Sequence, residues 1–188
     1  VYRCFKTRKD LAQEAAGAPH GMGEVFTGAP LPQAEEAALL AQGRAFAWRL
    51  SITACRHALG AEFDALSFEA DAATVQAQPG LLGDVILGRK DFPASYHLAS
   101  VLDDAAQGIT HVIRGEDLKE TAHLHVLLQK LLELPTPSYR HHRLILAEDG
   151  KRLAKRDQAQ TLRSLREAGE TPLTLRARLG LAGGASPV

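Results

Sequence analysis

The chain has 188 residues, of which 45% are hydrophobic and 23% are charged, and its formal net charge is zero. These values indicate one sizeable globular domain or two small ones. A membrane span is excluded because no apolar run approaches the ~20 residues that it needs, and a disulfide framework is excluded because Cys4 and Cys55 are the only cysteines. No signal-peptide pattern is found, so we expect a cytoplasmic protein with no membrane partner. The chain starts at Val1 inside a strand-like stretch, which suggests a piece of a longer protein.

The first ninety residues predict short elements separated by glycine and proline. Helices are expected over residues 8–16, 32–42 and 51–59, and strands over residues 46–50, 66–70 and 84–88. Each helix starts at a polar capping residue or a proline and stops at a glycine. The first strand shows the alternation of large apolar and smaller or polar residues that a half-buried strand requires.

An apolar run over residues 96–102 opens the most regular part of the chain. It ends at Asp103 and Asp104, which could hold magnesium but are more typical of a cap for the turn that follows. A β-branched strand is then expected over residues 110–114, closed by Gly115.

The segment after this strand has the pattern of a long helix. Asp117 and Glu120 are spaced like a capping box, and the leucines behind them recur at helical spacing, so one side should be buried. A strand, a tight glycine turn and a helix make the βα unit of a doubly wound sheet, so we predict an α/β fold. Further on we expect a strand over residues 143–147, a turn at 148–150, a basic loop over 151–157, and helices over 162–168 and from about residue 172.

The charge is concentrated at the C-terminal end. From Tyr139 onward Lys and Arg outnumber Asp and Glu ten to five, whereas residues 1–138 carry twelve against seventeen. The basic loop alone has four cations within residues 151–156, and such a loop can close on a triphosphate. A solvated loop or a patch that binds a nucleic-acid backbone explains the same residues equally well.

Arg114 is the strongest single candidate for a ligand contact. It stands at the carboxyl end of a predicted strand, where ligands bind in open α/β sheets, and a guanidinium there can hold a carboxylate with two hydrogen bonds. The alternative is a structural pair with Glu116 or Asp117. Tyr96 and His97 could reach the same crevice, although a tyrosine at the start of an apolar run is more often a core residue. The eight histidines lack the spacing of a metal site.

Three stretches, residues 96–104, 108–118 and 149–156, together resemble the glutamyl-tRNA synthetase group of class I aminoacyl-tRNA synthetases. Within that group the chain looks most like the short branch of glutamyl-Q tRNA(Asp) synthetases. The opening segment 2–9 resembles that branch's Tyr-x-Cys-x-Cys-Thr-Arg segment, and the chain finishes soon after the basic loop.

The resemblance implies a role for particular residues. Tyr96 and Arg114 match positions that bind L-glutamate, and Lys155 matches the second lysine of the KMSKS signature loop, the contact to the ATP phosphates and our predicted catalytic residue. Arg152 and Ala154 replace the first lysine and the serine of that signature. The whole predicted ATP-binding loop is Arg152, Leu153, Ala154, Lys155 and Arg156.

The family's zinc site is eroded in this sequence. Its pattern is Cys-x-Cys followed by Tyr-x-x-x-Cys, but here the four positions hold Cys4, Lys6, Phe26 and Pro30. Cys4 is the only surviving ligand position, and one thiol cannot replace four ligands, so we predict that zinc is absent.

The resemblance also implies a domain plan and an activity. We expect an α+β acceptor-stem-like insertion over residues 1–93 with the degenerate zinc region at 1–30, the second half of a Rossmann-type catalytic fold over 94–138, and a stem-contact region with the basic loop over 139–188. The expected partners are ATP with Mg²⁺, L-glutamate and tRNA(Asp), whose queuosine would receive the glutamate, in a monomeric enzyme. The alternatives are a fragment of a glutamyl-tRNA synthetase that charges tRNA(Glu), and a non-catalytic paralogue that binds tRNA or nucleotide. Because the HIGH-containing half-domain is missing, we expect this piece alone to be inactive.

Overall fold

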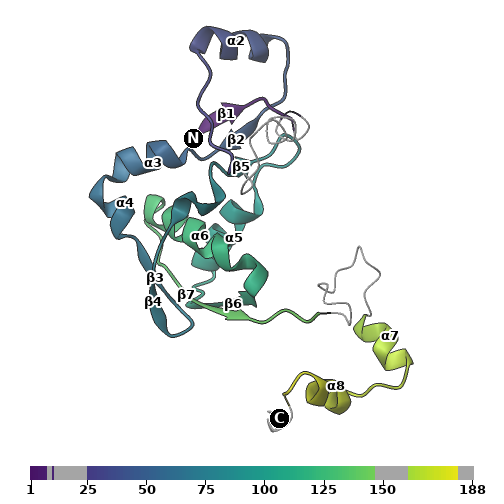
Figure 1. The fold of residues 1–188 in the computed structure, drawn as a ribbon. Coiled ribbons are helices and arrows are strands. Elements are labelled where there is room, and N and C mark those ends of the chain that lie inside the picture. Colours follow the sequence, from purple (N-terminus) through teal and green to yellow (C-terminus); the bar gives the residue numbers. More distant parts are fainter. Residues whose placement is uncertain (8–9, 11–24, 147–160, 182–188) are drawn as a thin grey trace, which may run out of the picture. The chain divides into compact units, whose positions relative to one another are not determined.

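A computed structural model describes residues 1–7, 10, 25–146 and 161–181 (Figure 1). The chain divides into two compact units, Val1–Arg143 and Leu144–Val188. None of the helices in these described ranges is long and apolar enough to cross a membrane.

The first unit begins with a three-stranded antiparallel sheet. Its strands are β1 (Tyr2–Cys4), β2 (Ala47–Arg49) and β5 (Ile86–Gly88), in the order β1-β2-β5. Helix α2 (Gln33–Ala41) lies in the connection between β1 and β2 and has Pro32 as its N-cap. The strands predicted around residues 48 and 86 and the helix after Pro32 are therefore confirmed.

Asp84 ties this small sheet together. Its carboxylate accepts hydrogen bonds from the Tyr2 hydroxyl at 2.9 Å, the Gly28 N–H at 2.9 Å and the Ile52 N–H at 2.8 Å. The Arg49 guanidinium donates to its carbonyl oxygen, and the Asp84 side chain is almost completely buried. A Cβ at Gly28 would collide with the Tyr2 hydroxyl, so only glycine allows this approach. Three segments that are distant in sequence are thus joined to the carboxylate of Asp84.

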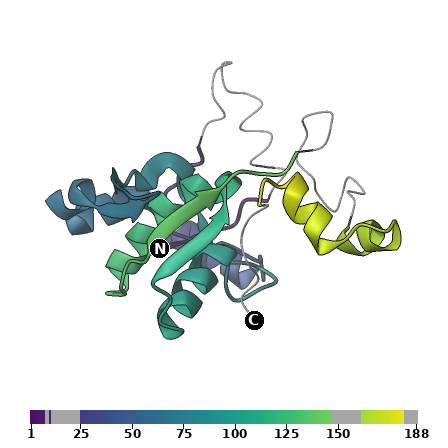
Figure 2. The ribbon, with the colours of Figure 1, turned by 90° about the horizontal axis from the view of Figure 1, so that it is seen from below.

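The second sheet is mainly parallel and contains the predicted βα unit. Its strands are β3 (Ser67–Ala70), β4 (Ala73–Gln76), β6 (His111–Gly115) and β7 (Ser138–His142), in the order β4-β3-β7-β6. β7 runs parallel to both neighbours, and only β4 is antiparallel, to β3. Figure 2 shows β6 and β7 side by side, pointing the same way. This arrangement confirms an α/β fold.

Helix α6 (Lys119–Leu131) covers one face of this sheet and has eight buried residues. Leu124 and Leu127 have no exposed surface, as the leucine spacing predicted. Helix α5 (Tyr96–Ala106) packs beside α6 and buries Val101. The remaining described elements of this unit are α3 (Ile52–Leu59), α4 (Ala61–Ala65), and 3-10 turns at Pro79–Leu82 and Glu116–Leu118.

The second unit contains two short helices in its described part. α7 (Leu162–Glu167) and α8 (Pro172–Arg178) start at Thr161 and Thr171, and each threonine forms a capping box with a hydroxyl three residues later. The prediction of a helix capped by Thr161 and another from Pro172 is confirmed.

Three local predictions are wrong. The strand expected over residues 143–147 lies earlier, at β7, because Tyr139 is the side chain that packs into the core. Asp117 is not the N-cap of α6, since it lies inside the 3-10 turn and Leu118 holds the N-cap position. Asp103 and Asp104 do not cap a new turn, because α5 continues through them to Ala106.

Candidate active site

Five elements bring polar side chains together where β6 and β7 end. Arg114 is the penultimate residue of β6, and Tyr96 is the first residue of α5. His125 lies on α6, Tyr139 and His141 lie on β7, and Asp71 follows β3. In an α/β sheet the carboxyl ends of parallel strands form the ligand-binding edge, and Arg114 lies there as predicted.

The guanidinium of Arg114 is held on two sides. Its Cζ lies 5.1 Å from the centre of the Tyr139 ring, within cation–π range. Its Nε donates to Nε2 of His141 across 3.4 Å. Nη2 of Arg114 is buried and has no hydrogen-bond partner. A buried donor without an acceptor is costly, so this nitrogen is an exception that calls for an explanation.

Tyr96 is not a core residue. It is 53% exposed, so the interpretation of a buried, structural tyrosine is wrong. Its ring lies against two imidazoles, with centroid distances of 5.6 Å to His97 and 5.9 Å to His125. Tyr96 is therefore a solvent-accessible residue next to the buried His125.

The two imidazoles behind Tyr96 form a pair. Nδ1 of His97 and Nε2 of His125 are 3.2 Å apart. Burial, followed by the charge of Arg114 and by the neighbouring His97, lowers the pKa of His125 to about 3. Burial, followed by the Arg114 charge, also lowers the pKa of His97. Both rings are thus neutral near pH 7, so they can accept a hydrogen bond without adding positive charge beside Arg114.

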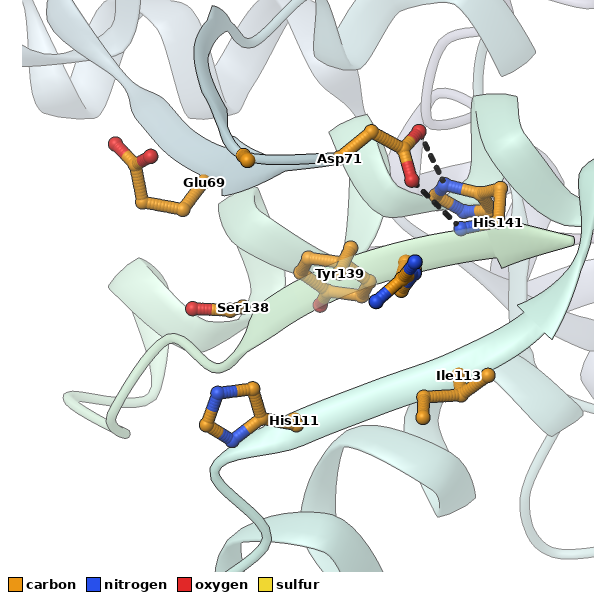
Figure 3. Close-up of a pocket in the computed structure, with 9 residues that line it drawn as sticks. Glu69, Asp71, His111, Ile113, Ser138, Tyr139 and His141 are labelled. Carbon is orange, nitrogen blue, oxygen red and sulfur yellow. Dashed lines mark hydrogen bonds and ion pairs between the residues drawn. The ribbon is translucent and has the colours of Figure 1, made fainter. Parts of the chain in front are cut away.

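His141 lies between Arg114 and Asp71. The backbone N–H of His141 donates to Oδ1 of Asp71 at 3.0 Å, and Nδ1 of its ring lies 3.8 Å from Oδ2 of the same carboxylate (Figure 3). The hydrogen bond from the His141 backbone is the main cause that lowers the pKa of Asp71, so the carboxylate is charged at neutral pH. Burial and then the Arg114 charge lower the pKa of His141.

Further polar atoms in this region also lack partners. Oγ of Ser100, one helical turn after Tyr96, and Oε1 of Gln129 are buried without a hydrogen bond. Nε2 of Gln129 donates to the Tyr139 hydroxyl at 3.0 Å. Sequence reasoning missed Ser100, His125, Gln129, Tyr139, His141 and Asp71 as members of this cluster. Their residue types gave no signal on their own, because each is important only through a partner distant in the chain.

A cavity of about 690 Å³ lies against the sheet beside this cluster (Figure 3). Side chains that alternate with the core residues of the strands line it, including Glu69, His111, Ile113 and Arg140. Ile113 is 69% exposed, so the cavity opens to solvent. Asp71 and His141 also line it, which makes them the link between the cavity and Arg114.

The predicted ATP-binding loop, with Lys155 as its catalytic residue, lies outside the described residues. The same is true of the helix predicted over residues 8–16, apart from Asp10, whose N–H bonds the Thr7 hydroxyl at 3.2 Å as a cap would.

The residues at the four zinc positions do not fit a zinc site. Cys4 is buried on β1, and the second position holds Lys6, whose Nζ lies 5.6 Å from the centre of the Phe26 ring at the third. Pro30 has no side-chain donor. A cation and an aromatic ring attract each other where two ligands would have shared a metal. No step of the chemistry is therefore assigned to zinc.

Comparison with known proteins places the chain in a family. The model of the family described as tRNA synthetases class I (E and Q), catalytic domain, matches residues 63–187. The chain belongs to this family, which confirms the predicted fold and the predicted class of aminoacyl-tRNA synthetase-like ligase. Enzymes of this class use ATP with Mg²⁺.

Individual relatives show which members of the family this chain is similar to. The chain is 56% identical over 100 residues to a glutamyl-Q tRNA(Asp) synthetase of Rhodobacter capsulatus, covering 53% of this chain and 36% of that protein. It is 40% identical over 174 residues to the glutamyl-Q tRNA(Asp) synthetase of Nocardia farcinica, covering 92% and 52%. It is also 35% identical over 191 residues to glutamate–tRNA ligase 2 of Methylorubrum populi, covering 100% and 41%.

A solved structure agrees with these relatives. A glutamate tRNA ligase from Elizabethkingia meningosepticum in complex with its amino acid superposes with a TM-score of 0.62 at 29% identity, covering 83% of this chain and 32% of that one. The chain spans about half or less of the length of the proteins it matches.

Proposed function

We propose that the protein carrying this sequence activates L-glutamate with Mg²⁺ and ATP and transfers it to the queuosine of tRNA(Asp). The family supports amino-acid activation, and several similar relatives are named glutamyl-Q tRNA(Asp) synthetase. In this proposal residues 1–93 are the acceptor-stem-like insertion, 94–138 the second half of the catalytic fold and 139–188 the stem-contact region. The protein is proposed to act as a cytoplasmic monomer.

The observation that carries this proposal is the unpartnered nitrogen of Arg114 beside an exposed tyrosine. Nη2 of Arg114 is buried and unbonded, while its Nε is already occupied by His141. A carboxylate of glutamate would supply the missing acceptor, and each charge-assisted hydrogen bond contributes roughly 1.5–3 kcal/mol. The hydroxyl of the exposed Tyr96 would contact the same amino acid.

The proposed chemistry needs positioning and neutralisation of charge. An oxygen of the glutamate α-carboxylate attacks the α-phosphorus of ATP. The bond between this phosphorus and the oxygen that bridges it to the β-phosphate breaks, and pyrophosphate leaves. In this scheme Lys155 and the basic loop stabilise the negative charge on the phosphates, which requires no proton transfer from the protein. Arg114 holds the amino acid in place during the attack.

A glutamyl-tRNA synthetase that charges tRNA(Glu) is the alternative that a specific observation favours. The similarity to glutamate–tRNA ligase 2 extends over 100% of this chain, further than that to the glutamyl-Q relatives above. Transfer of labelled glutamate by the protein that carries this sequence decides between them. We expect transfer to tRNA(Asp) that contains queuosine, and faster transfer to tRNA(Glu) would establish the alternative.

A second assay tests whether the protein is catalytic. Glutamate-dependent exchange of pyrophosphate into ATP should be lost in the Lys155→Ala variant of the protein that carries this sequence. Unchanged exchange would remove Lys155 from the mechanism, and its absence from the wild-type protein would favour a paralogue that only binds tRNA or nucleotide. The isolated 188-residue chain should show no exchange.

A further inference from the structure

We infer that Asp71 and His141 are positioning residues, which hold the Arg114 guanidinium at the orientation its carboxylate ligand requires. This inference rests on the proposed function, because Arg114 matters only if it binds the amino acid. In this inference both residues act on the ligand through Arg114.

The direction of the hydrogen bond from Arg114 determines the tautomer of His141. A guanidinium has only donors, so Nε2 of His141 must be the acceptor and cannot carry a hydrogen. The hydrogen of a neutral ring then lies on Nδ1, the atom that faces Oδ2 of Asp71 at 3.8 Å. The His141 side chain is only 3% exposed, so water does not compete for either nitrogen. Nδ1 makes no hydrogen bond, so its attraction to Asp71 is electrostatic, whereas Nε2 is held directly by Arg114.

Asp71 is itself fixed by the tight turn between β3 and β4. Asp71 and Ala72 have φ values of 50° and 65°, a left-handed conformation that aspartate tolerates better than most residues. Its Oδ1 holds the backbone N–H of His141 at 3.0 Å. The carboxylate is therefore hydrogen-bonded to the backbone of His141, and its second oxygen lies near the ring of the same residue, at 3.8 Å from Nδ1.

This arrangement restrains a side chain that is otherwise mobile. A free arginine side chain has about 2 kcal/mol of rotamer entropy, and part of it is lost before the ligand arrives when the side chain is already anchored. The Tyr139 ring supports the guanidinium from one side and His141 takes its Nε, which leaves the outer nitrogens for a carboxylate.

A proton on His141 would disrupt the anchor. It would remove the acceptor for Nε and place a second cation beside the guanidinium. The charged groups around His141 act in both directions, since Arg114 and Lys119 oppose its protonation and Asp71 favours it. Because burial and Arg114 lower the pKa of His141, the anchor stays intact at neutral pH and is lost only on acidification below the ordinary histidine range.

The tautomer can be measured without any ligand. Long-range ¹H–¹⁵N correlation spectra of the ¹⁵N-labelled 188-residue chain at pH 7 report which ring nitrogen of His141 carries hydrogen. We expect Nδ1–H, and a loss of this preference in Asp71→Asn. An Nε2–H tautomer or an imidazolium in the wild-type chain would overturn the inference.

Kinetics then test the consequence for the ligand. In pyrophosphate exchange by the protein that carries this sequence, His141→Leu should raise the KM for glutamate about five- to tenfold, the loss of one hydrogen bond, with the KM for ATP unchanged. His141→Gln can present an amide oxygen to Nε and should restore most of the affinity. His142→Leu, on the same strand with an exposed side chain, is the matched control and should leave both constants unchanged.

The outcomes separate the two proposals. An equal increase of the KM for glutamate in His141→Leu and His141→Gln, or no increase in either, would overturn the positioning role. If the wild-type protein shows no glutamate-dependent exchange at all, the proposed function fails, while the tautomer of His141 still decides whether the anchor exists.

Discussion

Two buried polar clusters in the first unit differ in how completely they are bonded. The cluster around Asp84 is closed, because the carboxylate accepts three hydrogen bonds and its backbone N–H donates to Phe26 at 2.7 Å. The cluster around Arg114 is open, with unpartnered atoms on Arg114, Ser100, Gln129 and His141. A closed cluster stabilises a fold, whereas an open one is held in place by its surroundings and is available to a ligand.

The two clusters differ in which atoms of their arginines lack a hydrogen bond, since the region of the first cluster also has unpartnered atoms. Nε of Arg3 and of Arg49 are buried without a partner. However, the outer nitrogens of both side chains are engaged, Arg3 with Glu36 and Arg49 with the Asp84 carbonyl. In Arg114 the pattern is reversed, because Nε is bonded and Nη2 is not. The free end of Arg114 is the end that can hold a carboxylate with two hydrogen bonds.

The largest expected effect is that of Arg114→Ala on catalysis. Loss of two charge-assisted hydrogen bonds should lower kcat/KM for glutamate by roughly 10²–10⁴ in the exchange assay. Arg114→Lys keeps the charge but not the planar, forked guanidinium, so it should recover only a small part of the lost kcat/KM. Arg140→Ala changes an exposed arginine of the neighbouring strand and serves as the control. If the alanine variant at position 114 kept full activity, the open cluster would not be the amino-acid site.

Asp84→Ala should instead affect stability. The Tyr2 hydroxyl and two backbone N–H groups would be buried without an acceptor, so we expect a loss of about 3–5 kcal/mol in the free energy of unfolding, measured with urea. Asp91→Ala, which breaks an exposed pair with Arg89, should cost at most about 0.5 kcal/mol. Similar values for the two variants would show that the Asp84 cluster is not what holds the small sheet.

The main elements of the fold could be predicted because each is encoded locally. The leucine spacing of α6, the threonine caps of α7 and α8 and the β-branched strand that carries Arg114 all depend on neighbouring residues. β7 was missed because its sequence, Ser-Tyr-Arg-His-His, looks polar. It lies between two parallel strands and needs only Tyr139 to pack against the helices, so its hydrophobic signal is weak.

Only part of the candidate site could be found in the same way. Tyr96 and Arg114 stand out by residue type and by their place at the ends of elements. The role of His141 depends on Asp71, which is 70 residues away, and on the register that places His141 opposite Arg114. No local pattern contains these relations, because they arise only when the sheet is assembled.

The open cluster should also make stability depend on pH. Burial holds the pKa of His125 near 3 in the folded chain, against about 6.5 when unfolded. Below pH 6.5 the unfolded state therefore binds more protons, so stability that is complete above this pH is lost as the pH falls toward 3. From pH 7 to pH 5 the loss should be roughly 2 kcal/mol, and His125→Gln should reduce it. Urea unfolding at both pH values checks this. If the free energy of unfolding fell by the same amount from pH 7 to pH 5 in the wild-type and the His125→Gln proteins, this would argue against a neutral, buried His125.

The smallest expected effect is that of metal removal, and it concerns the small sheet that contains the closed cluster around Asp84. If Asp84 and the contacts of Phe26 hold the small sheet, a chelator such as EDTA should leave the melting temperature unchanged, and elemental analysis should find no stoichiometric zinc. The Arg49 guanidinium lies 4.3 Å from the centre of the Phe26 ring, and Lys6 lies over the same ring, so a cation at the former metal position would meet two positive side chains. Phe26→Leu should therefore lower the melting temperature with or without zinc. Stoichiometric zinc, or a fall in the melting temperature on chelation, would show that a metal holds this region and that the cation–π contacts are secondary.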